Sequence, residues 1–308
     1  MKAKFLIVGG GGFLGAHLTS ALLENGYCVR SLGRGLKPAL FEENLHGLED
    51  YEWIQGDYSN IDTLNYAMQG VEFIAHLAST TLPKTSNDDP VRDVFENLIP
   101  SIQLMDRAAK NNVKKLIYFS SGGTVYGAPK KIPIEETDPT DPICSYGIHK
   151  LAVEKYLQLY QGLGGLNFSV MRIANPYGPG QSGINGQGII GSYLNKIKKN
   201  EQIQIWGDGS TVRDYVHVAD VISATLNLVQ YTGNKQIFNV GSGVGISINS
   251  LISMMEMNYS GEIKKMYMEP RGVDIKQNIL DIELIKKETG WAPKHSLDKY
   301  IKQTLRDY

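Results

Sequence analysis

The chain has 308 residues, with 31 Lys and Arg against 32 Asp and Glu, so its formal net charge is −1. This balance lacks the basic excess typical of nucleic-acid-binding proteins, and no apolar run approaches the roughly 20 residues that a membrane helix needs. The hydrophobic content of 42% is ordinary for a soluble globular protein, and a chain of this length suggests about two domains.

The first predicted element is an apolar strand over 4–8, which leads into four consecutive glycines and an amphipathic segment over 13–25. This order is typical of a dinucleotide-binding turn, because glycine lets the backbone approach a pyrophosphate and the helix N-terminus offers free N–H groups. Two spacings fit the glycine motif: one uses Gly9 and the other Gly10, each followed by Gly12 and Gly15. The residues of this turn expected at the cofactor are Gly9, Gly12, Phe13, Leu14 and Gly15.

The second strand, over 28–32, is followed by Gly33-Arg34-Gly35. An NAD-binding protein usually carries Asp or Glu here, on the ribose 2′-hydroxyl. No acid is present, and Arg34 could pair with a 2′-phosphate, with Arg30 nearby. The sequence therefore favours NADP(H), while NAD(H) stays possible if Arg34 is only a solvated turn residue.

Further strands are expected over 52–55, 72–76, 115–119 and 168–172, with helices near 60–69, 91–111 and 145–162 between them. This alternation predicts an α/β fold with a parallel sheet covered on both faces. The pattern loosens after residue 175, but 236–240 reads as a strand that rejoins the sheet. We expect a dinucleotide-binding domain over 1–174 plus roughly 212–242, and a substrate domain over 175–211 and 243–308.

Tyr146 and Lys150 lie four residues apart on the predicted helix 145–162, so they share one face. An ammonium beside a phenol favours the phenolate and lowers the phenol pKa from about 10. A tyrosine tuned in this way can exchange a proton with a carbinol while hydride moves to or from a nicotinamide. The pair is common by chance, and its position after five strand–helix units gives it weight.

The strand over 115–119 ends in a loop rich in hydroxyls and glycine, from Ser120 to Gly127. Sites in open α/β sheets lie beyond the carboxyl ends of the strands, so these hydroxyls should face a ligand. The alternative is that they only satisfy backbone groups in a turn.

Other motifs extend the pattern over nearly the whole length. They are Gly56-Asp57, His76-Leu77-Ala78-Ser79, Asn175-Pro176-Tyr177-Gly178-Pro179, Trp206-Gly207-Asp208-Gly209 and Arg213-Asp214-Tyr215-Val216-His217-Val218. Together with the glycine cluster, the hydroxyl loop and the Tyr146/Lys150 pair, they resemble the extended short-chain dehydrogenases/reductases of the nucleotide-sugar epimerase/dehydratase family, which includes UDP-glucose 4-epimerase. The resemblance implies a Rossmann-type doubly wound parallel sheet with a smaller mixed α/β domain that binds a nucleotide-diphosphate sugar.

The resemblance also implies roles for particular residues. Tyr146 would be the acid/base and Lys150 would hold the nicotinamide ribose. Ser121 or Thr124, which flank Gly122, would supply the catalytic hydroxyl that the family has at that position and would touch the sugar. The further cofactor residues would be Arg34, Asp57, Tyr58, Leu77, Ala78, Ser79, Asn97 and Ser120. The further substrate residues would be Asn175, Gln187, Arg213, Arg271 and Asp274, with the two arginines as a diphosphate clamp.

The chain departs from the family pattern at two places. Gly122 stands where the family usually has its catalytic Ser or Thr, and Gly123-Thr124 stands where dehydratases keep an Asp-Glu pair. Loss of water from the sugar needs an acid and a base, so a dehydratase is disfavoured. Three functions stay open: an NADPH-dependent reductase of a 4-keto nucleotide sugar of the dTDP-6-deoxyhexose type, which we favour, a 4-epimerase that retains NAD, and a non-catalytic NAD(P) sensor.

Expected partners and location follow from the same reading. The helices over 91–111 and 145–162 have more apolar surface than one sheet face covers, and in the family they form an intersubunit bundle, so a homodimer is expected. Cys28 and Cys144 lie far apart without metal-site spacing, and the chain starts without signal-peptide features. We therefore expect a cytoplasmic protein with reduced thiols, and no bound metal, nucleic acid or membrane.

Overall fold

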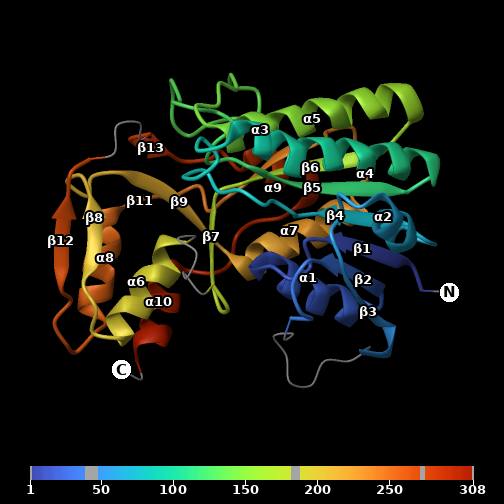
Figure 1. Ribbon diagram of the computed structural model, residues 1–308. Coiled ribbons are helices and arrows are strands. Elements are labelled where there is room, and N and C mark those ends of the chain that lie inside the picture. Colours follow the sequence, from blue (N-terminus) through green and yellow to red (C-terminus); the bar gives the residue numbers. More distant parts are fainter. Residues whose placement is uncertain (1, 39–47, 182–187, 271–274, 307–308) are drawn as a thin grey trace.

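The computed structural model describes residues 2–38, 48–181, 188–270 and 275–306. These residues form a larger part, built on one wide sheet, and a smaller part of short strands and helices beside it (Figure 1). Among them, no helix has the length and apolar character needed to cross a membrane, and no group of three or more His, Cys, Asp or Glu side chains is placed to hold a metal ion.

The elements have the following bounds. The strands are β1 (Lys4–Val8), β2 (Cys28–Gly33), β3 (Tyr51–Gln55), β4 (Phe73–His76), β5 (Lys115–Ser121), β6 (Phe168–Ile173), β7 (Asn175–Tyr177), β8 (Ile203–Trp206), β9 (Val212–His217), β10 (Ile237–Val240), β11 (Gly245–Ser247), β12 (Lys265–Met268) and β13 (Gln277–Asn278). The helices are α1 (Phe13–Glu24), α2 (Ile61–Ala67), α3 (Pro90–Asp93), α4 (Ile99–Lys110), α5 (Ser145–Gly164), α6 (Ile189–Lys198), α7 (Val218–Gln230), α8 (Ile248–Met257), α9 (Glu283–Thr289) and α10 (Leu297–Leu305), with a 3₁₀ turn η1 (Leu48–Asp50) and a π-helical turn η2 (Val94–Leu98).

The wide sheet has seven parallel strands in the order β10-β6-β5-β4-β1-β2-β3. Alternate residues of each strand point to opposite faces. In β1, Phe5 and Ile7 join the core that contains α1 and α7, whereas Leu6 and Val8 join the core that contains α2, α4 and α5. Burial on both faces explains the continuous apolar runs of these strands and confirms the predicted doubly wound α/β fold.

The predicted helix over 91–111 is three consecutive segments, α3, η2 and α4, which together run without a break from Pro90 to Lys110. The predicted start signal is confirmed, because the Asp89 side chain accepts a hydrogen bond from Arg92 N at 2.9 Å and Pro90 is the first helical residue. Helix α4 packs against α5, and the two run side by side along one face of the molecule (Figure 1).

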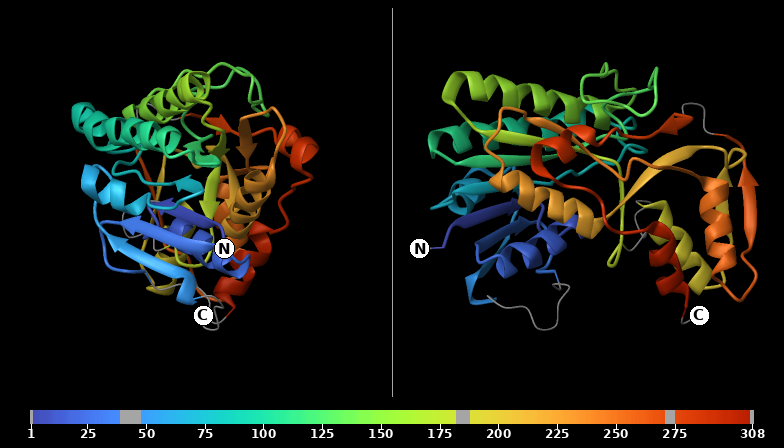
Figure 2. Two further views of the ribbon diagram at one scale, coloured as in Figure 1. Left: turned by 90° about the vertical axis from the view of Figure 1, so that its right-hand side faces the viewer. Right: turned by 180° about the vertical axis from the view of Figure 1, so that it is seen from behind.

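The smaller part contains β9, which pairs in parallel with β7 and β13 and antiparallel with β11, and a separate parallel pair, β8 and β12. Its own apolar core joins α6, α8 and α10 to these strands. From behind, these elements form a compact unit at one side of the wide sheet (Figure 2).

Two segments differ from the expected division of the chain. Strand β10 pairs with β6 as expected, but β9, expected in the larger part, belongs to the smaller sheet. Conversely, Ile285 of α9 and Trp291 lie in the core of the larger part, because α9 covers the outermost strand β10. We therefore propose that 212–217 belongs to the smaller part and 279–291 to the larger part.

Candidate active site

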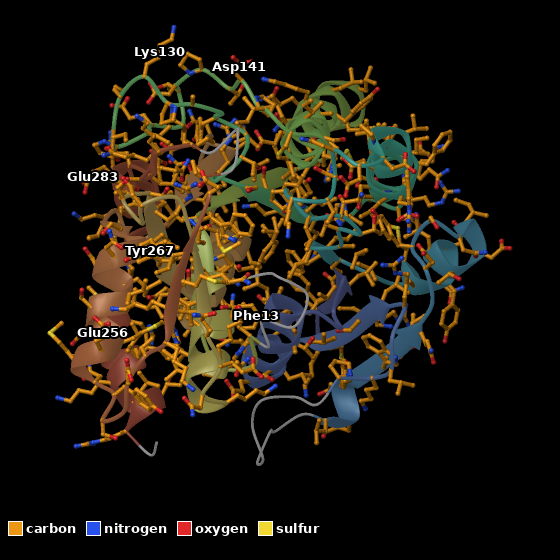
Figure 3. The ribbon with its side chains drawn as sticks, turned by 60° about the vertical axis from the view of Figure 1, so that its left-hand side comes forward. Phe13, Lys130, Asp141, Glu256, Tyr267 and Glu283 are labelled. Atoms are coloured by element: carbon orange, nitrogen blue, oxygen red, sulfur yellow. The ribbon has the colours of Figure 1, made fainter. Side chains whose placement is uncertain are left out.

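A cleft of about 1160 Å³ lies between the two parts, at the carboxyl ends of β1, β2, β4, β5 and β6. Parallel sheets place their ligand sites at this edge. Most of the predicted site residues line it: Gly9, Gly12, Phe13, Leu14, Gly15, Arg34, Asp57, Tyr58, Leu77, Ala78, Ser79, Ser120, Ser121, Tyr146, Lys150, Asn175 and Arg213. Phe13, at the start of α1, lies in the middle of the molecule, between the strands of the wide sheet and the smaller part (Figure 3).

Five predicted residues do not line the cleft or cannot be placed. Gln187, Arg271 and Asp274 lie outside the described residues. Thr124 and Asn97 are described and stand behind the cleft wall. Tyr193, Trp206 and Ile248 line the cleft on its smaller-part side without having been predicted. Trp206 could have been predicted, because it belongs to the motif Trp206-Gly207-Asp208-Gly209 that supports the family resemblance. Nothing in the sequence around Tyr193 and Ile248 distinguishes them from ordinary apolar core positions.

The glycine turn leaves no room for a side chain at Gly9 or Gly15. A Cβ on Gly9, whose φ is +96°, would lie 2.7 Å from Ala78 N, and one on Gly15 would lie 2.4 Å from Gly9 O. Gly10 packs against the Ser31 side chain instead of lining the cleft, so the spacing of Gly9, Gly12 and Gly15 is the one that borders it. No side chain caps the first turn of α1 and no acid lies in it. This turn therefore fits a pyrophosphate.

The end of β2 is also closely packed. A Cβ on Gly33 would lie 2.7 Å from Cη2 of Trp53, so an acid at this position would collide with the indole ring. Arg34 follows and lines the cleft. Arg30 does not line it, because its guanidinium is buried against Glu52 Oε2 at 2.7 Å and donates to Ala67 O at the end of α2.

Tyr146 and Lys150 lie on the first turns of α5, with Lys150 Nζ 5.5 Å from the centre of the Tyr146 ring. Lys150 Nζ donates to Phe119 O at 2.9 Å, and burial lowers the Lys150 pKa to about 8 against the raising effect of Asp93 and Glu154. The pKa of Tyr146 is raised by burial, and further by Cys144 and Asp93. The predicted lowering of the Tyr146 pKa is therefore wrong here, because enclosure of the phenol outweighs the ammonium.

The last residues of β5 and the loop that follows them divide their hydroxyls between the core and the cleft. Ser120 Oγ donates to Glu154 Oε1 at 2.5 Å, and Glu154 forms a buried ion pair with Arg172 at 2.7 Å. The Thr124 hydroxyl is buried, and it has no hydrogen-bond partner among the described residues. Ser121 lines the cleft, so it is the better placed of the two predicted catalytic hydroxyls.

The Cβ of a residue in place of Gly122 would point into the core. It would lie 2.6 Å from Leu280 Cδ1 and 3.0 Å from Arg172 O. Leu280 therefore fills the space in which a side chain at position 122 would have to stand.

Asn97 supports the cleft wall from behind. Its Oδ1 accepts from Thr80 N at 2.8 Å, and its Nδ2 donates to the carboxylate of Asp93 at 2.9 Å. Thr80 lines the cleft and Asn97 does not, so Asn97 supports the loop that carries Thr80, as expected of a residue that supports the hydrogen bonds on the cofactor side.

On the other wall, Arg213 of β9 donates from Nη1 to Val212 O and Ile275 O. Asn175 Nδ2 donates to Asp214 O at 2.9 Å. Both side chains are therefore anchored to the smaller sheet while they border the cleft.

Known proteins of one family match this chain over nearly its whole length. A family model described as the NAD dependent epimerase/dehydratase family matches residues 5–241. The chain is 32% identical to a putative UDP-glucose 4-epimerase of Methanocaldococcus jannaschii, with 97% of this chain and 96% of that protein covered. It is also 32% identical to a dTDP-4-dehydro-6-deoxyglucose reductase of Escherichia coli, with 99% of this chain and 97% of that protein covered. The crystal structure of a Thermotoga maritima UDP-glucose 4-epimerase with UDP-glucose superposes with a TM-score of 0.90 at 34% identity, covering 98% of this chain and 97% of that one.

Proposed function

Because the chain belongs to the NAD-dependent epimerase/dehydratase family, we propose that it reduces the 4-keto group of a nucleotide-diphospho 6-deoxy-4-ketohexose of the dTDP type, with NADPH as the reductant. The observation that carries this choice is the end of β2. Gly33 leaves no carboxylate to repel a 2′-phosphate, Trp53 closes the space in which one would stand, and Arg34 lines the cleft beside it. A reductase consumes its cofactor and exchanges it at each turnover, which suits NADPH.

Tyr146 and Lys150, on the first turns of α5, would carry out the proton transfer at C4 of the sugar. The cofactor, when bound, supplies the hydride. Tyr146 donates its phenolic proton to the C4 oxygen, and Lys150, charged at neutral pH with a pKa of about 8, stabilises the phenolate that remains. The Ser121 hydroxyl borders the same cleft and orients the C4 oxygen, in the role that the family gives to the position of Gly122.

The diphosphate of the substrate is held from the smaller part. Arg213 is anchored on β9 and lines the cleft, where its guanidinium suits phosphate oxygens. Asn175 borders the sugar, and Gln187, Arg271 and Asp274 complete the proposed set. A guanidinium suits the charge and geometry of a diphosphate, which a free hexose lacks, so a nucleotide-linked sugar is the fitting substrate class.

A 4-epimerase acting on a UDP-hexose is the second candidate. It is favoured by the relatives named as UDP-glucose 4-epimerases and by the related crystal structure that contains UDP-glucose. Such an enzyme would use Tyr146 first to take up the C4 hydroxyl proton and then to return it, and it would keep NAD bound.

A homodimer is proposed for either activity. Large apolar side chains remain exposed along η2, α4 and α5, among them Phe95 at 63% and Leu163 at 74%. Since these helices run side by side on one face, two copies related by a two-fold axis can cover them together.

The deciding experiment compares the two reactions on one preparation. Cofactor released from the purified protein is identified by its absorbance and mass, and NADPH consumption at 340 nm is followed with dTDP-4-dehydro-6-deoxyglucose. The reductase proposal requires one NADPH consumed per sugar, with turnover reduced by about 10²–10⁴ in Tyr146→Phe. Retained NAD and interconversion of UDP-glucose and UDP-galactose without added cofactor would identify the epimerase instead.

A further inference from the structure

A buried carboxylate lies next to the helix turn that carries Tyr146. Asp93, the last residue of α3, has a side chain with 0% exposure. It accepts hydrogen bonds from Ser145 Oγ at 2.7 Å, His149 Nδ1 at 2.8 Å, Asn97 Nδ2 at 2.9 Å and Thr81 Oγ1. These donors come from the cleft loop after β4, from η2 and from α5, so Asp93 ties three segments together.

The same stretch of chain caps the catalytic helix. Cys144, at the N-cap of α5, makes no side-chain cap. The first two amides of the helix donate to side chains that are distant in sequence. Ser145 N donates to Asn87 Oδ1 at 2.9 Å, and Tyr146 N donates to Ser86 Oγ at 3.0 Å. Because Thr80 and Thr85 of this loop line the cleft, the wall of the cleft and the backbone of Tyr146 are fixed to one another.

The charge states of this cluster are defined by its contacts. Burial pushes the Asp93 pKa upward, but hydrogen bonds from Thr81, Ser145 and His149 hold it below the ordinary value, so the carboxylate is ionised at neutral pH. Burial and the Lys150 charge lower the His149 pKa to about 4. The imidazole is therefore neutral, and its Nδ1 carries the hydrogen that Asp93 accepts.

We propose that Asp93 is a positioning residue for Tyr146: it fixes the first turn of α5 against the cleft loop, and its negative charge keeps the phenol protonated until the C4 oxygen takes the proton. This inference rests on the proposed acid role of Tyr146. A turn of π-helix, η2, begins directly after Asp93 and lets Asn97 reach back to the same carboxylate.

The direction of the electrostatic effect follows from the groups around the phenol. Among the residues that the structure describes, the titratable groups that face Tyr146 are Asp93, Tyr118, Cys144, His149 and Lys150. Among the ionised ones, Lys150 favours the phenolate and Asp93 opposes it. Removal of the Asp93 charge must therefore lower the pH at which Tyr146 loses its proton.

The test variant is Asp93→Asn. We expect kcat to fall by roughly 10–100-fold, as misplacement of a reacting group does, with KM changed less than kcat. The alkaline limb of the kcat profile, which reports loss of the Lys150 and Tyr146 protons, should move down by about one pH unit, because the Asp93 charge favours the protonated form of both groups. Amide hydrogen exchange over 144–150 and 80–81 should speed up, a readout that needs no turnover. Ser145→Ala keeps the Asp93 charge and removes one of the hydrogen-bond donors to Asp93, so its alkaline limb should not move down. If Asp93→Asn does not fold, amide hydrogen exchange in Ser145→Ala tests the positioning role.

Asp220→Asn is the matched control. Asp220 is also buried and accepts from a histidine, His295 Nδ1, at 2.8 Å, but its carboxylate bonds to residues 294–295 and not to α5 or the loop after β4. Its variant should melt earlier and leave both the alkaline limb and the exchange over 144–150 unchanged.

The outcomes separate the two proposals. Full turnover in Tyr146→Phe would remove the proposed acid and with it the electrostatic part of the inference. A deficient Tyr146→Phe beside an Asp93→Asn enzyme with an unmoved alkaline limb, or with unchanged exchange over 144–150, would overturn the role of Asp93 alone. A shift of the alkaline limb in Asp220→Asn equal to that in Asp93→Asn would do the same.

Discussion

Replacement of Gly122 by Ser restores the hydroxyl that the family pattern has at this position, and we expect it to cost stability without a gain in turnover. The new Cβ would lie 2.6 Å from Leu280 Cδ1 and 3.0 Å from Arg172 O, whereas carbon atoms pack at about 3.5–4.0 Å. Leu280 has 0% exposure and therefore cannot move aside freely. Overpacking of this kind costs about 1–3 kcal/mol. Since Gly122 does not line the cleft, the hydroxyl would not reach the substrate.

The assay is thermal unfolding of four proteins in a double-mutant cycle with Leu280→Ala. That substitution alone should cost about 2–5 kcal/mol through its cavity. In the double variant the serine occupies the vacated space, so the combined cost should fall short of the sum by about 1 kcal/mol or more. Gly123→Ser is the control, because its Cβ would meet only Ser121 Oγ, at 3.9 Å. Additive costs, or a Gly122→Ser protein as stable as the control, would refute the steric reasoning.

Three further predictions address the cofactor, the assembly and a buried lysine. Arg34→Ala should weaken NADPH binding by about 1–3 kcal/mol in calorimetry and leave NADH unchanged, while Lys37→Ala, whose ammonium stacks on Tyr51 at 4.7 Å, should change neither; equal losses for both cofactors would contradict the 2′-phosphate pocket. Phe95→Asp should convert a dimer into a monomer in light scattering, and a monomeric wild type at micromolar concentration would contradict the interface. Burial lowers the Lys115 pKa from 10.5 to about 8 in the folded protein, so the unfolded chain binds more protons between these pH values and the wild type gains stability there as pH rises. The melting temperature of the wild type minus that of Lys115→Met should therefore rise from pH 8 to 10, and a constant value would speak against it.

Local patterns predicted the elements that depend on near neighbours. The strand, glycine turn and helix around Gly9 carry their own steric logic, and the spacing of Tyr146 and Lys150 places both on one helix face wherever that helix packs. The seven strands of the wide sheet were all predicted, because burial on two faces leaves an unbroken apolar run in each.

The remaining features depend on contacts between distant segments. The raised pKa of Tyr146 comes from enclosure by other parts of the chain, which spacing on one helix does not contain. Arg30 is close in sequence to the predicted cofactor-binding segment Gly33-Arg34-Gly35. Its guanidinium nevertheless bonds to Glu52 and to Ala67 O at the end of α2, away from the cleft. The hydroxyl of Thr124 turns into the protein because of the path of the loop after β5. The place of α9 beside β10 likewise joins residues far apart in the chain.

The chain passes repeatedly between the larger and the smaller part, at β6 to β7, β9 to α7, β10 to β11, β13 to α9 and α9 to α10. Each part is therefore built from several separate segments of the chain, so neither part can be excised as one continuous fragment. A truncation after residue 174 would strip β10, α7 and Trp291 from the core of the wide sheet. The two walls of the cleft therefore depend on one continuous chain, and exchange of the smaller part between relatives would require several simultaneous crossovers in the gene.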